Sequence, residues 1–331
     1  MNARIIHVGL GPLGRTLLGD FVSRGLGEIV AAVDTNPELA GRDLSEYVAG
    51  APSGVRVQGT LDELPEADAA IVTTRSALPD CAETFRTLLA RGLPVISTCE
   101  ELLWPSLRHA ALADDLDAHA KAHGGRLMGT GVNPGFLMDT LAAVVSTACH
   151  RVDRVRIERV QNAASRRTPF QKKIGASMSP EAFRAGVDQG WLRHVGLGES
   201  MALACHALGL AFDDWDEQIE PVLAAEPMQC ALGAIPAGHA SGVRQVARAR
   251  SGGETVATLE FVAAIGQADP RDAIHIEGKP DLSVVIPGGV HGDVATSAVT
   301  LNALASLLDS APGLHTMLSI RTPHLAVAPR G

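Results

Sequence analysis

"GLGPLG", residues 9–14, begins at the end of a short apolar segment, residues 4–10, and opens a stretch in which leucines recur at helical spacing. Gly9 permits a tight turn, Gly11 lets a pyrophosphate approach the backbone, and Gly14 lets the helix pack close to the strand. The exposed N–H groups at the start of the helix favour the negative charge of phosphates. This strand, turn and helix therefore predict a dinucleotide-binding unit.

An acid at the end of the second strand supports the same interpretation. Asp34 closes the apolar segment 28–34, twenty residues after Gly14, where a carboxylate can accept hydrogen bonds from both ribose hydroxyls. Its charge would repel a 2′-phosphate, so NAD is favoured over NADP, although the nearby Arg42 leaves use of both cofactors open. The cofactor-binding residues predicted in this region are Gly9, Gly11, Pro12, Leu13, Gly14 and Asp34.

Strand and helix patterns alternate through the first 134 residues. A helical pattern surrounds residues 80–91 and another covers roughly 101–123, each between short apolar segments. This alternation is typical of βαβ units and a parallel sheet. The remaining predicted strands are residues 55–60, 69–75, 93–99 and 125–131.

The pattern changes after about residue 150. Residues 151–161 alternate apolar and polar side chains, as a half-exposed antiparallel strand does, and later segments repeat that style, two of them joined through Gly252-Gly253. Helical patterns lie between them at 180–188 and 198–209. The predicted fold class is therefore α/β, with an N-terminal Rossmann parallel sheet and a mostly antiparallel α+β domain.

The predicted domain limits follow from these patterns. Residues 1–134 form the dinucleotide-binding domain, and residues 135–292 form a domain for substrate binding and dimerisation. The last long helix, residues 293–308, is apolar on more than one face and should be buried. We expect the C-terminal part, residues 293–331, to pack back on the first domain.

Composition excludes several classes of function. The chain has 331 residues, a net charge of −9 and only 3% aromatic residues, without the basic stripe that a nucleic acid requires. It has no secretory leader pattern and no apolar run of about 18 residues, so we expect a cytoplasmic protein without a membrane partner. The five dispersed cysteines favour free buried thiols over disulfides, and no metal site is predicted.

Ligands of open parallel sheets bind beyond the carboxyl ends of the strands. Thr73, Thr74 and Arg75 lie at the end of one predicted strand, and the corner GTGVNPG, residues 129–135, lies at the end of another. Its glycines would let the backbone approach a nicotinamide, and Asn133 can hold a carboxamide. The alternative is a domain-crossing turn without ligand contact. The cofactor-binding residues predicted at this edge are Thr73, Thr74, Arg75, Asn133 and Pro134.

Two acids follow the strand at residues 93–99. Glu100 or Glu101, in a cleft lined by apolar residues, can act as a general base or hold a cationic substrate. One of the two is expected to have only a structural role in the first turn of the next helix, where the helix dipole favours a negative charge. We assign that role to Glu101 and the catalytic role to Glu100, with Glu101 as the second candidate.

Two polar stretches complete the set of candidate residues. Residues 164–177 carry several basic side chains around a proline turn, and residues 287–297 place His291 among glycines, with Asp293 at a helix start. Their structural interpretations are a solvated basic loop and an N-cap formed by Asp293. The candidates for substrate contact here are Arg166, Arg167, Lys172 and His291.

Five motifs, in this order along the chain, resemble the dihydrodipicolinate reductase-like family: GLGPLG, STCEEL, GTGVNPGFLMD, SRRTPFQKKIGAS and GGVHGDVAT. Within it they are similar to the branch of 2,4-diaminopentanoate dehydrogenases and native amine dehydrogenases. The similarity runs from residue 5 to about residue 320. Dihydrodipicolinate reductases proper carry a paired-histidine stretch and K-x-D-A-P-S-G-T, where this chain has residues 165–173 instead, so lysine biosynthesis is not expected.

The resemblance implies an NAD(P)-dependent oxidoreductase that deaminates an amine, or aminates a ketone or aldehyde with ammonia in reverse. The family's catalytic glutamate corresponds to Glu100, and its subunits pair through the sheet of the second domain, which implies a homodimer. A diamino acid substrate would use the basic loop for its carboxylate. A simple alkyl amine would instead contact apolar residues such as Val132, Phe136 and Leu137.

Two other functions remain open at this stage. The first alternative is a reductase of another carbonyl or cyclic imine substrate. The second is a non-catalytic sensor that binds the dinucleotide. A sensor does not require a carboxylate at the nicotinamide edge, and a plain reductase does not respond to ammonium. Oxidation of NADH by carbonyl compounds, with and without ammonium, separates these possibilities.

Overall fold

The computed structural model describes residues 1–166 and 168–326, which divide into two units. The first unit comprises residues 1–136 together with the segment from His291 onward, and the second comprises residues 137–290. Each unit has its own sheet and its own buried apolar core.

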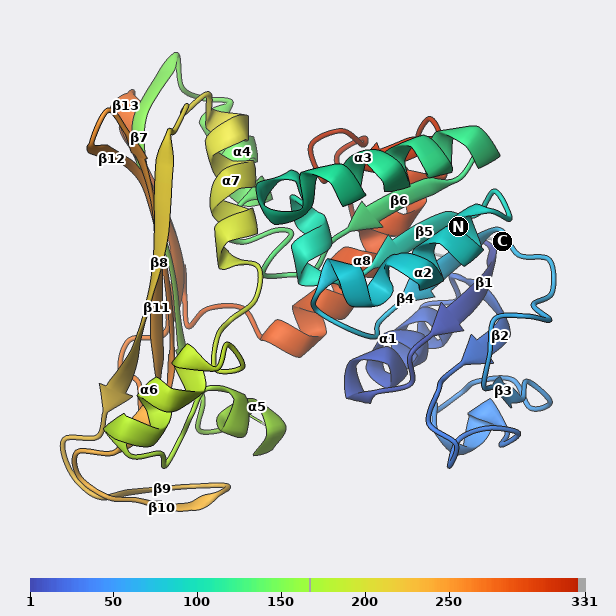
Figure 1. Cartoon of the computed structure of the whole chain (residues 1–331), viewed down its shortest axis with the longest axis horizontal. Coiled ribbons are helices and arrows are strands. Elements are labelled where there is room, and N and C mark those ends of the chain that lie inside the picture. The colour runs from blue at the N-terminus through green and yellow to red at the C-terminus, as the bar shows by residue number, and fades with distance from the viewer. Residues whose placement is uncertain (167, 327–331) are drawn as a thin grey trace. The chain divides into compact units, whose positions relative to one another are not determined.

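Seven strands form the sheet of the first unit, and every pair of neighbours in it is parallel (Figure 1). Their order is β15-β6-β5-β4-β1-β2-β3, so the sheet starts at β1 and extends in both directions, as in doubly wound folds. The strands are β1 (Ala3–Val8), β2 (Gly27–Val33), β3 (Val57–Gln58), β4 (Ala69–Val72), β5 (Pro94–Ser97), β6 (Arg126–Gly129) and β15 (Gly313–His315).

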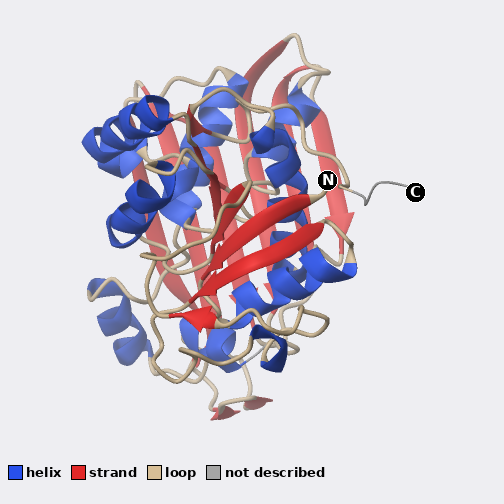
Figure 2. Ribbon diagram, turned by 90° about the vertical axis from the view of Figure 1, so that its right-hand side faces the viewer, coloured by secondary structure: helices blue, strands red, loops and turns tan. Residues whose placement is uncertain are grey.

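Helices cover both faces of this sheet (Figure 2). One apolar core joins the strands to α1 (Pro12–Ser23) and α8 (Gly292–Leu308), and the other joins them to α2 (Leu78–Leu89) and α3 (Ser106–His123). Two short 3₁₀ helices, η1 (Leu44–Glu46) and η2 (Glu100–Leu103), lie in the connections. Because both faces are covered, the strands are mostly apolar, which explains their largely hydrophobic sequences.

The long C-terminal helix α8 completes the core of the first unit. Leu301, Leu304 and Leu307 are fully buried with residues of α1 and the sheet. Polar contacts accompany this packing, since Ser297 Oγ donates to the Asp20 carboxylate at 2.5 Å and Arg24 donates to the side-chain oxygen Oδ1 of Asn302 at 2.7 Å. The last long helix is therefore a structural part of the first unit.

The second unit is built on a six-stranded mixed sheet of order β14-β13-β7-β12-β11-β8. The strands are β7 (Arg151–Asn162), β8 (Asp214–Leu223), β11 (Ala240–Ser251), β12 (Glu254–Ala264), β13 (Arg271–Lys279) and β14 (Leu282–Pro287), beside a separate two-stranded ribbon of β9 (Met228–Cys230) and β10 (Gly233–Ile235). Gly252 and Gly253, both with positive φ, turn β11 into β12 as predicted. The predicted fold class is confirmed.

One detail of the sheet differs from the prediction. Residues 151–161 were expected to be purely antiparallel, but β7 pairs parallel with β12 on one side and antiparallel with β13 on the other. The β11–β12 hairpin enters the sheet with its second strand beside β7, and this places two strands of the same direction next to each other. Alternation of side chains indicates exposure of one face, and it carries no information on direction.

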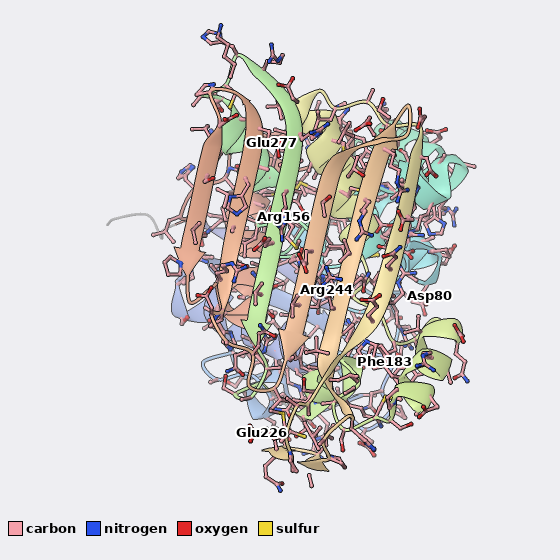
Figure 3. The ribbon with its side chains drawn as sticks, turned by 90° about the vertical axis from the view of Figure 1, so that its left-hand side faces the viewer. Asp80, Arg156, Phe183, Glu226, Arg244 and Glu277 are labelled. Atoms are coloured by element: carbon pink, nitrogen blue, oxygen red, sulfur yellow. The ribbon has the colours of Figure 1, made fainter. Side chains whose placement is uncertain are left out.

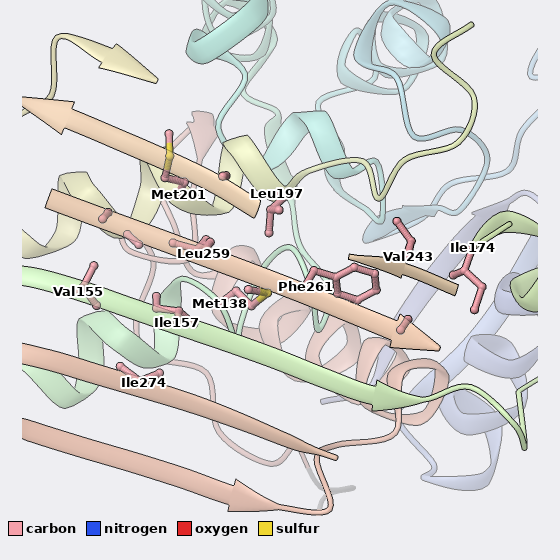
Figure 4. Close-up of a cluster of buried hydrophobic side chains, with 14 of the residues drawn as sticks. Met138, Val155, Ile157, Ile174, Leu197, Met201, Val243, Leu259, Phe261 and Ile274 are labelled. Atoms are coloured by element: carbon pink, nitrogen blue, oxygen red, sulfur yellow. The ribbon is translucent and has the colours of Figure 1, made fainter. Parts of the chain in front are cut away.

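The described residues of the second unit form the helices α4 (Thr140–Ser146), α5 (Thr168–Lys173), α6 (Pro180–Asp188) and α7 (Leu197–Leu208). The core beneath them contains Met201 of α7 with Ile157, Leu259 and Phe261 of the strands, each buried (Figure 4). The other face of the sheet is rich in charged side chains, among them Arg156 and Arg244 (Figure 3). The sheet therefore has one apolar face and one polar face.

Some elements differ from their predicted extent. The strand expected at 55–60 is reduced to Val57–Gln58, and β8, β15 and the β9–β10 ribbon had no predicted counterpart. β8 lies at the edge of its sheet, where acidic residues and Pro221 are tolerated, so it lacks a strand pattern. All five cysteines are free, but Cys149 and Cys230 are only partly buried, contrary to the expectation of buried thiols.

A buried ion pair holds the end of the second unit. Arg159 and Asp272, 2% and 5% exposed, are joined at 2.7 Å, and both contact the backbone of Val290: the guanidinium donates to its carbonyl at 3.0 Å and Asp272 accepts from its N–H at 2.7 Å. The pair thus fixes the last residue of the unit.

We predict that Asp272→Asn lowers the free energy of unfolding by about 1.5–3 kcal/mol, because the buried guanidinium of Arg159 loses its charged acceptor. Chemical denaturation measures this change. The matched control is Asp269→Asn, since Asp269 also pairs with an arginine, Arg271, but is 82% exposed. Equal effects of the two variants would contradict the importance of burial.

Candidate functional site

The carboxyl edge of the parallel sheet is defined by one row of backbone hydrogen bonds beyond the strand ends. The Gly9 N–H donates to the backbone carbonyl of Val33 at 2.8 Å. The N–H groups of Thr73, Thr98 and Thr130 continue the row, each donating to a backbone carbonyl of the neighbouring strand, at 2.8, 3.1 and 2.9 Å. The glycine-rich turn, the residues after β4, the turn that carries Glu100, and the GTGVNPG corner therefore all begin at this edge. These are the predicted site segments of the first unit.

The glycines of the turn have the geometry that their predicted roles require. Gly9 has φ +102°, and a Cβ at Gly14 would lie 2.0 Å from the Gly9 carbonyl oxygen. Gly11, the N-cap of α1, has open space around its missing side chain and no side-chain cap, and Pro12 is the first helical residue. A close backbone approach at Gly11 and a bare helix N-terminus suit a pyrophosphate. Leu13 lies in the same first turn.

Asp34 follows β2 at the same edge, where its carboxylate is already hydrogen-bonded to the backbone. One oxygen accepts from Leu10 N–H at 2.6 Å and the other from Asn36 N–H at 2.8 Å. Asp34 thus ties the glycine-rich turn to the end of β2. Each oxygen has a second lone pair for a ribose hydroxyl. Arg42 forms an ion pair with Glu46, and this contact raises the pKa of Arg42.

His7, which the sequence analysis did not identify, makes contacts that hold the glycine-rich turn in place. Its Nε2 lies 2.8 Å from the Gly9 carbonyl oxygen and 3.1 Å from Thr73 Oγ1, and Thr73 Oγ1 in turn donates to the Gly9 carbonyl at 2.8 Å. Burial lowers the pKa of His7 to about 4, so the ring is neutral at pH 7. Thr74 and Arg75 follow at exposed positions, with Thr74 Oγ1 3.6 Å from Cys81 Sγ.

The GTGVNPG corner is closed by contacts that only glycine permits. Gly135 has φ +129°, and its Cβ would lie 2.4 Å from the Gly131 nitrogen. The Asn133–Pro134 peptide bond is cis, and Val132, 4% exposed, donates its N–H to Thr296 Oγ1 of α8 at 3.4 Å. The corner is therefore folded against itself and joined to α8.

Glu100 and Glu101 have different surroundings. Glu101 Oε2 accepts from Leu78 N–H at the start of α2 and lies 2.9 Å from His109 Nε2 of α3. The side chain of half-buried Glu100 has no hydrogen bond or ion pair to any residue that the structure describes. Glu101 thus connects two helices, whereas the Glu100 carboxylate is available for a ligand.

The turn that carries Glu100 rests directly on β6. A Cβ at Gly129 would lie 2.6 Å from the Leu102 carbonyl carbon and 2.8 Å from the Leu103 nitrogen. Leu102 and Leu103 are buried, so η2 is held by its apolar side while Glu100 begins its first turn. Gly129 therefore sets the position of this turn.

In the second unit, part of the basic stretch at residues 164–177 forms the short helix α5. Arg166 stacks over the Phe170 ring at 4.2 Å, Lys172 is exposed, and Lys173 borders a cavity. The prediction for Arg167 lies outside the described residues. Buried Gln171, which the sequence analysis did not identify, anchors the loop by donating to three carbonyls, those of Ala163, Ala164 and Arg166 at 3.0–3.2 Å.

The other predicted substrate-contacting residues lie near the limits of the units. Half-buried Phe136 ends the first segment of the first unit, and Leu137, 3% exposed, begins the second unit beside Leu141 and Ile274. His291 caps α8, its Nδ1 accepting from Val294 N–H at 3.5 Å. The alternative that Asp293 forms this cap is wrong, because Asp293 is the second helical residue, two positions after the cap. The predicted contacts of Phe136, Leu137 and His291 with substrate stay predictions.

Residues 1–166 and 168–326 show neither a metal site nor a membrane-spanning helix. They contain no group of three or more metal-ligating side chains. No helix among them is both long and apolar enough to cross a membrane.

Comparisons with known proteins relate the chain to dehydrogenases. It is 25% identical over 334 aligned residues to 2,4-diaminopentanoate dehydrogenase of Acetoanaerobium sticklandii, covering 97% of this chain and 94% of that protein. The solved amine dehydrogenase of Mycobacterium smegmatis matches with a TM-score of 0.85 at 22% identity, over 100% of this chain and 99% of that one. A Bordetella pertussis WlbA dehydrogenase, solved with NADH and UDP-GlcNAcA, matches with a TM-score of 0.56 at 16% identity, over 94% and 90%.

The structural matches agree with the fold of both units. Residues 136–329 match the model of the 2,4-diaminopentanoate dehydrogenase C-terminal domain, more than half of the chain. The family predicted from the five motifs is confirmed, and with it the prediction of a dehydrogenase. The chain belongs to the 2,4-diaminopentanoate dehydrogenase family.

Proposed function

We propose that this protein catalyses the NAD(P)-dependent oxidative deamination of an amine, and the reverse amination of a ketone or aldehyde by ammonia. The observation that carries the proposal is the state of Glu100. It lies at the carboxyl edge of the parallel sheet, half-buried and without a partner among the described residues, while its neighbour Glu101 is bound to two helices. A sensor that only binds a dinucleotide does not require such a carboxylate.

The chemistry of amine oxidation explains why a carboxylate belongs here. The bound nicotinamide supplies the hydride acceptor. An amine gives up a hydride from its carbon only when its nitrogen has a free lone pair, so Glu100 first accepts a proton from the substrate ammonium. Once Glu100 has released this proton to solvent, its carboxylate also stabilises the positive charge that develops on nitrogen. Water then adds to the carbon, and ammonia leaves.

The same residues support a preference for NAD. Gly11, Pro12 and Leu13 form the start of α1 that would hold the pyrophosphate, and Asp34 would accept from the ribose. Arg42, the nearby cation that could pair with a 2′-phosphate, already forms an ion pair with Glu46. Thr73, Asn133 and Pro134 would border the nicotinamide at the same edge.

We predict that Asp34→Ala raises the KM for NAD about 10-fold and changes the KM for NADP less, because only NAD has the 2′-hydroxyl that the carboxylate binds. Initial rates with both cofactors at saturating amine measure the two values. Asp34→Asn is the matched variant, since an amide oxygen keeps an acceptor near Leu10 N–H. An equal rise for both cofactors would mean that Asp34 only supports the turn.

The proposed assembly is a homodimer through the charged face of the second unit's sheet. That face carries cross-strand ion pairs, such as Arg244–Glu260 at 2.7 Å and Arg156–Glu260 at 3.2 Å. Figure 3 shows Arg156 and Arg244 on it. Light scattering coupled to gel filtration should give a mass twice the 34.5 kDa of one chain. A monomer mass at micromolar concentration would refute this proposal.

Ammonium dependence tests the proposed reaction against its alternatives. We expect NADH oxidation by short ketones and aldehydes only when ammonium is present, and NAD reduction by the corresponding amines at alkaline pH. Turnover that ignores ammonium would identify a carbonyl reductase instead. Cofactor binding without turnover in either direction would identify a sensor.

A further inference from the structure

Two free cysteines of the first unit, Cys81 and Cys99, lie together in one of its apolar cores. Cys81 is near the start of α2, and Cys99 is the residue before η2. Their sulfur atoms contact consecutive residues of the loop after β4, since Cys81 Sγ donates to the Arg75 carbonyl at 3.5 Å and Cys99 Sγ donates to the Ser76 carbonyl at 3.2 Å. The two side chains are also hydrogen-bonded to each other. The fold thus brings together two thiols from different elements.

The pairing makes Cys81 the more reactive of the two thiols. Its hydrogen bond with Cys99 lowers the pKa of Cys81 more than burial raises it. The same hydrogen bond, followed by burial, raises the pKa of Cys99. Cys205 of the second unit provides a contrast, because burial raises the pKa of this thiol to about 12. Since the thiolate is the form that reacts with oxidants, Cys81 is the expected site of first attack.

The pair is buried, but exposed residues lie directly next to it. Cys81 and Cys99 are 0% and 1% exposed. Thr74, whose Oγ1 is 3.6 Å from Cys81 Sγ, is exposed, and so is Asp80, which precedes Cys81 in α2. A small oxidant such as hydrogen peroxide, which is little larger than water, therefore needs only a local opening of the loop after β4 to reach Cys81.

The position of Cys99 connects the pair to the turn that carries Glu100. Cys99 is the N-cap of η2, and Glu100 is the next residue. The Ser76 carbonyl holds this turn, because it accepts from Cys99 Sγ and from the Glu101 N–H, each at 3.2 Å. A disulfide has an S–S length of about 2.05 Å, so the Cys99 sulfur must leave the Ser76 carbonyl and move toward Cys81. Disulfide formation would therefore displace the start of η2.

We propose that Cys81 and Cys99 are a redox modification site, at which hydrogen peroxide forms a disulfide that displaces η2 and stops turnover. The Cys81 thiolate attacks one peroxide oxygen, the O–O bond breaks, and the leaving hydroxide takes up a proton to become water, which leaves a sulfenic acid on Cys81. The Cys99 sulfur then attacks the Cys81 sulfur. The S–S bond forms, and the hydroxyl group leaves as water with the Cys99 proton. The two thiols lose two electrons, and peroxide is reduced to water.

Oxidation of the full-length protein by hydrogen peroxide tests the site. After digestion, mass spectrometry should find the peptides of Cys81 and Cys99 linked to each other. The kcat for amine oxidation should fall at least about 10-fold at the rate at which the two thiols disappear, because a small displacement of a catalytic group is costly. Dithiothreitol should reverse both changes by thiol–disulfide exchange.

A second measurement follows the displacement of η2 without using activity. Trp104 is the C-cap of η2, so its fluorescence reports on the surroundings of this turn. With the other two tryptophans replaced (Trp191→Phe and Trp215→Phe), the fluorescence of Trp104 should change on oxidation and return on reduction. This reading of the site is independent of the proposed function, whereas the expected loss of turnover rests on the proposed role of Glu100.

Three variants assign the steps to the two thiols. In Cys99→Ser, oxidation should stop at the sulfenic acid of Cys81, which dimedone traps, whereas the wild-type protein should give little of this adduct. Cys81→Ser should keep its turnover in peroxide and give no adduct at Cys99. Cys205→Ala is the matched control, since Cys205 is also buried but lies in α7, and it should respond to peroxide as the wild type does. Melting temperatures of the reduced variants report on folding.

The outcomes separate this proposal from the proposed function. If peroxide oxidises the partly buried Cys149 and Cys230 but forms no link between Cys81 and Cys99, the redox site is refuted. A link that leaves the fluorescence of Trp104 or the kcat unchanged would overturn the displacement of η2. If the reduced protein oxidises no amine, the proposed function fails, and the linked peptides and the Trp104 fluorescence still decide whether the redox site exists.

Discussion

Glu100→Gln is expected to lower kcat for amine oxidation by about 10²–10⁴-fold, the usual contribution of a general base. Glutamine has nearly the same shape but cannot accept the proton of the substrate ammonium. The dissociation constant of NAD should stay within about 3-fold, since Glu100 lies on η2 rather than on the glycine-rich turn. Stopped-flow reduction of NAD gives the rate, and fluorescence titration with NADH gives the affinity.

The neighbouring acid provides the control for this variant. Glu101 joins Leu78 N–H of α2 to His109 of α3, so Glu101→Gln should lower the melting temperature while kcat stays within about 10-fold. A Glu100→Gln enzyme with full activity would remove Glu100 from the mechanism. If Glu101→Gln were the inactive variant instead, the two roles would have to be exchanged.

Gly129→Ala is expected to lower kcat by about 100-fold, although residue 129 carries no reactive group. The new Cβ would lie 2.6–2.8 Å from backbone and side-chain atoms of Leu102 and Leu103, so η2 must move away from β6. A displacement of about 1 Å at a catalytic group can cost this much rate. The loss should fall on kcat, with the KM for NAD little changed.

Gly59→Ala is the matched control for this substitution. Gly59 also lies in the first unit without positive φ, and a Cβ there would meet nothing within 4 Å. It should therefore leave both kcat and stability unchanged. If Gly129→Ala retained wild-type kcat, the close packing of η2 on β6 would not be what positions Glu100.

Local patterns explain why much of the first unit could be predicted. The turn at Gly9, Gly11 and Gly14 depends on backbone space within six residues, and Asp34 follows at the spacing that the fold requires. Strands buried on both faces appear as continuous apolar segments. The neighbouring acids Glu100 and Glu101 could be found in the same way, but their distinct surroundings depend on α2 and α3.

Features that depend on distant contacts could not be predicted. His7 stands in an apolar strand with no pattern around it, and it meets Thr73 only because β1 and β4 are neighbours. Arg193 and His194 belong to a short connection without a motif, and the cavity that they line with Lys173 is formed with α5 and β12. The sequence identifies the basic stretch as a candidate. It does not indicate which of its lysines borders this cavity, Lys173 or Lys172, because the answer depends on how α5 packs.

The place of α8 in the core has a consequence for the order of synthesis. During translation, residues 1–136 emerge before α8, and the face of their sheet that Leu301, Leu304 and Leu307 cover stays open to water until α8 is made. The second unit, which is continuous in sequence, is complete before that moment. On the ribosome, the second unit can therefore finish folding before the cofactor-binding unit, although most of that unit is synthesised first. A nascent chain that stops before residue 292 exposes an apolar surface to chaperones and proteases.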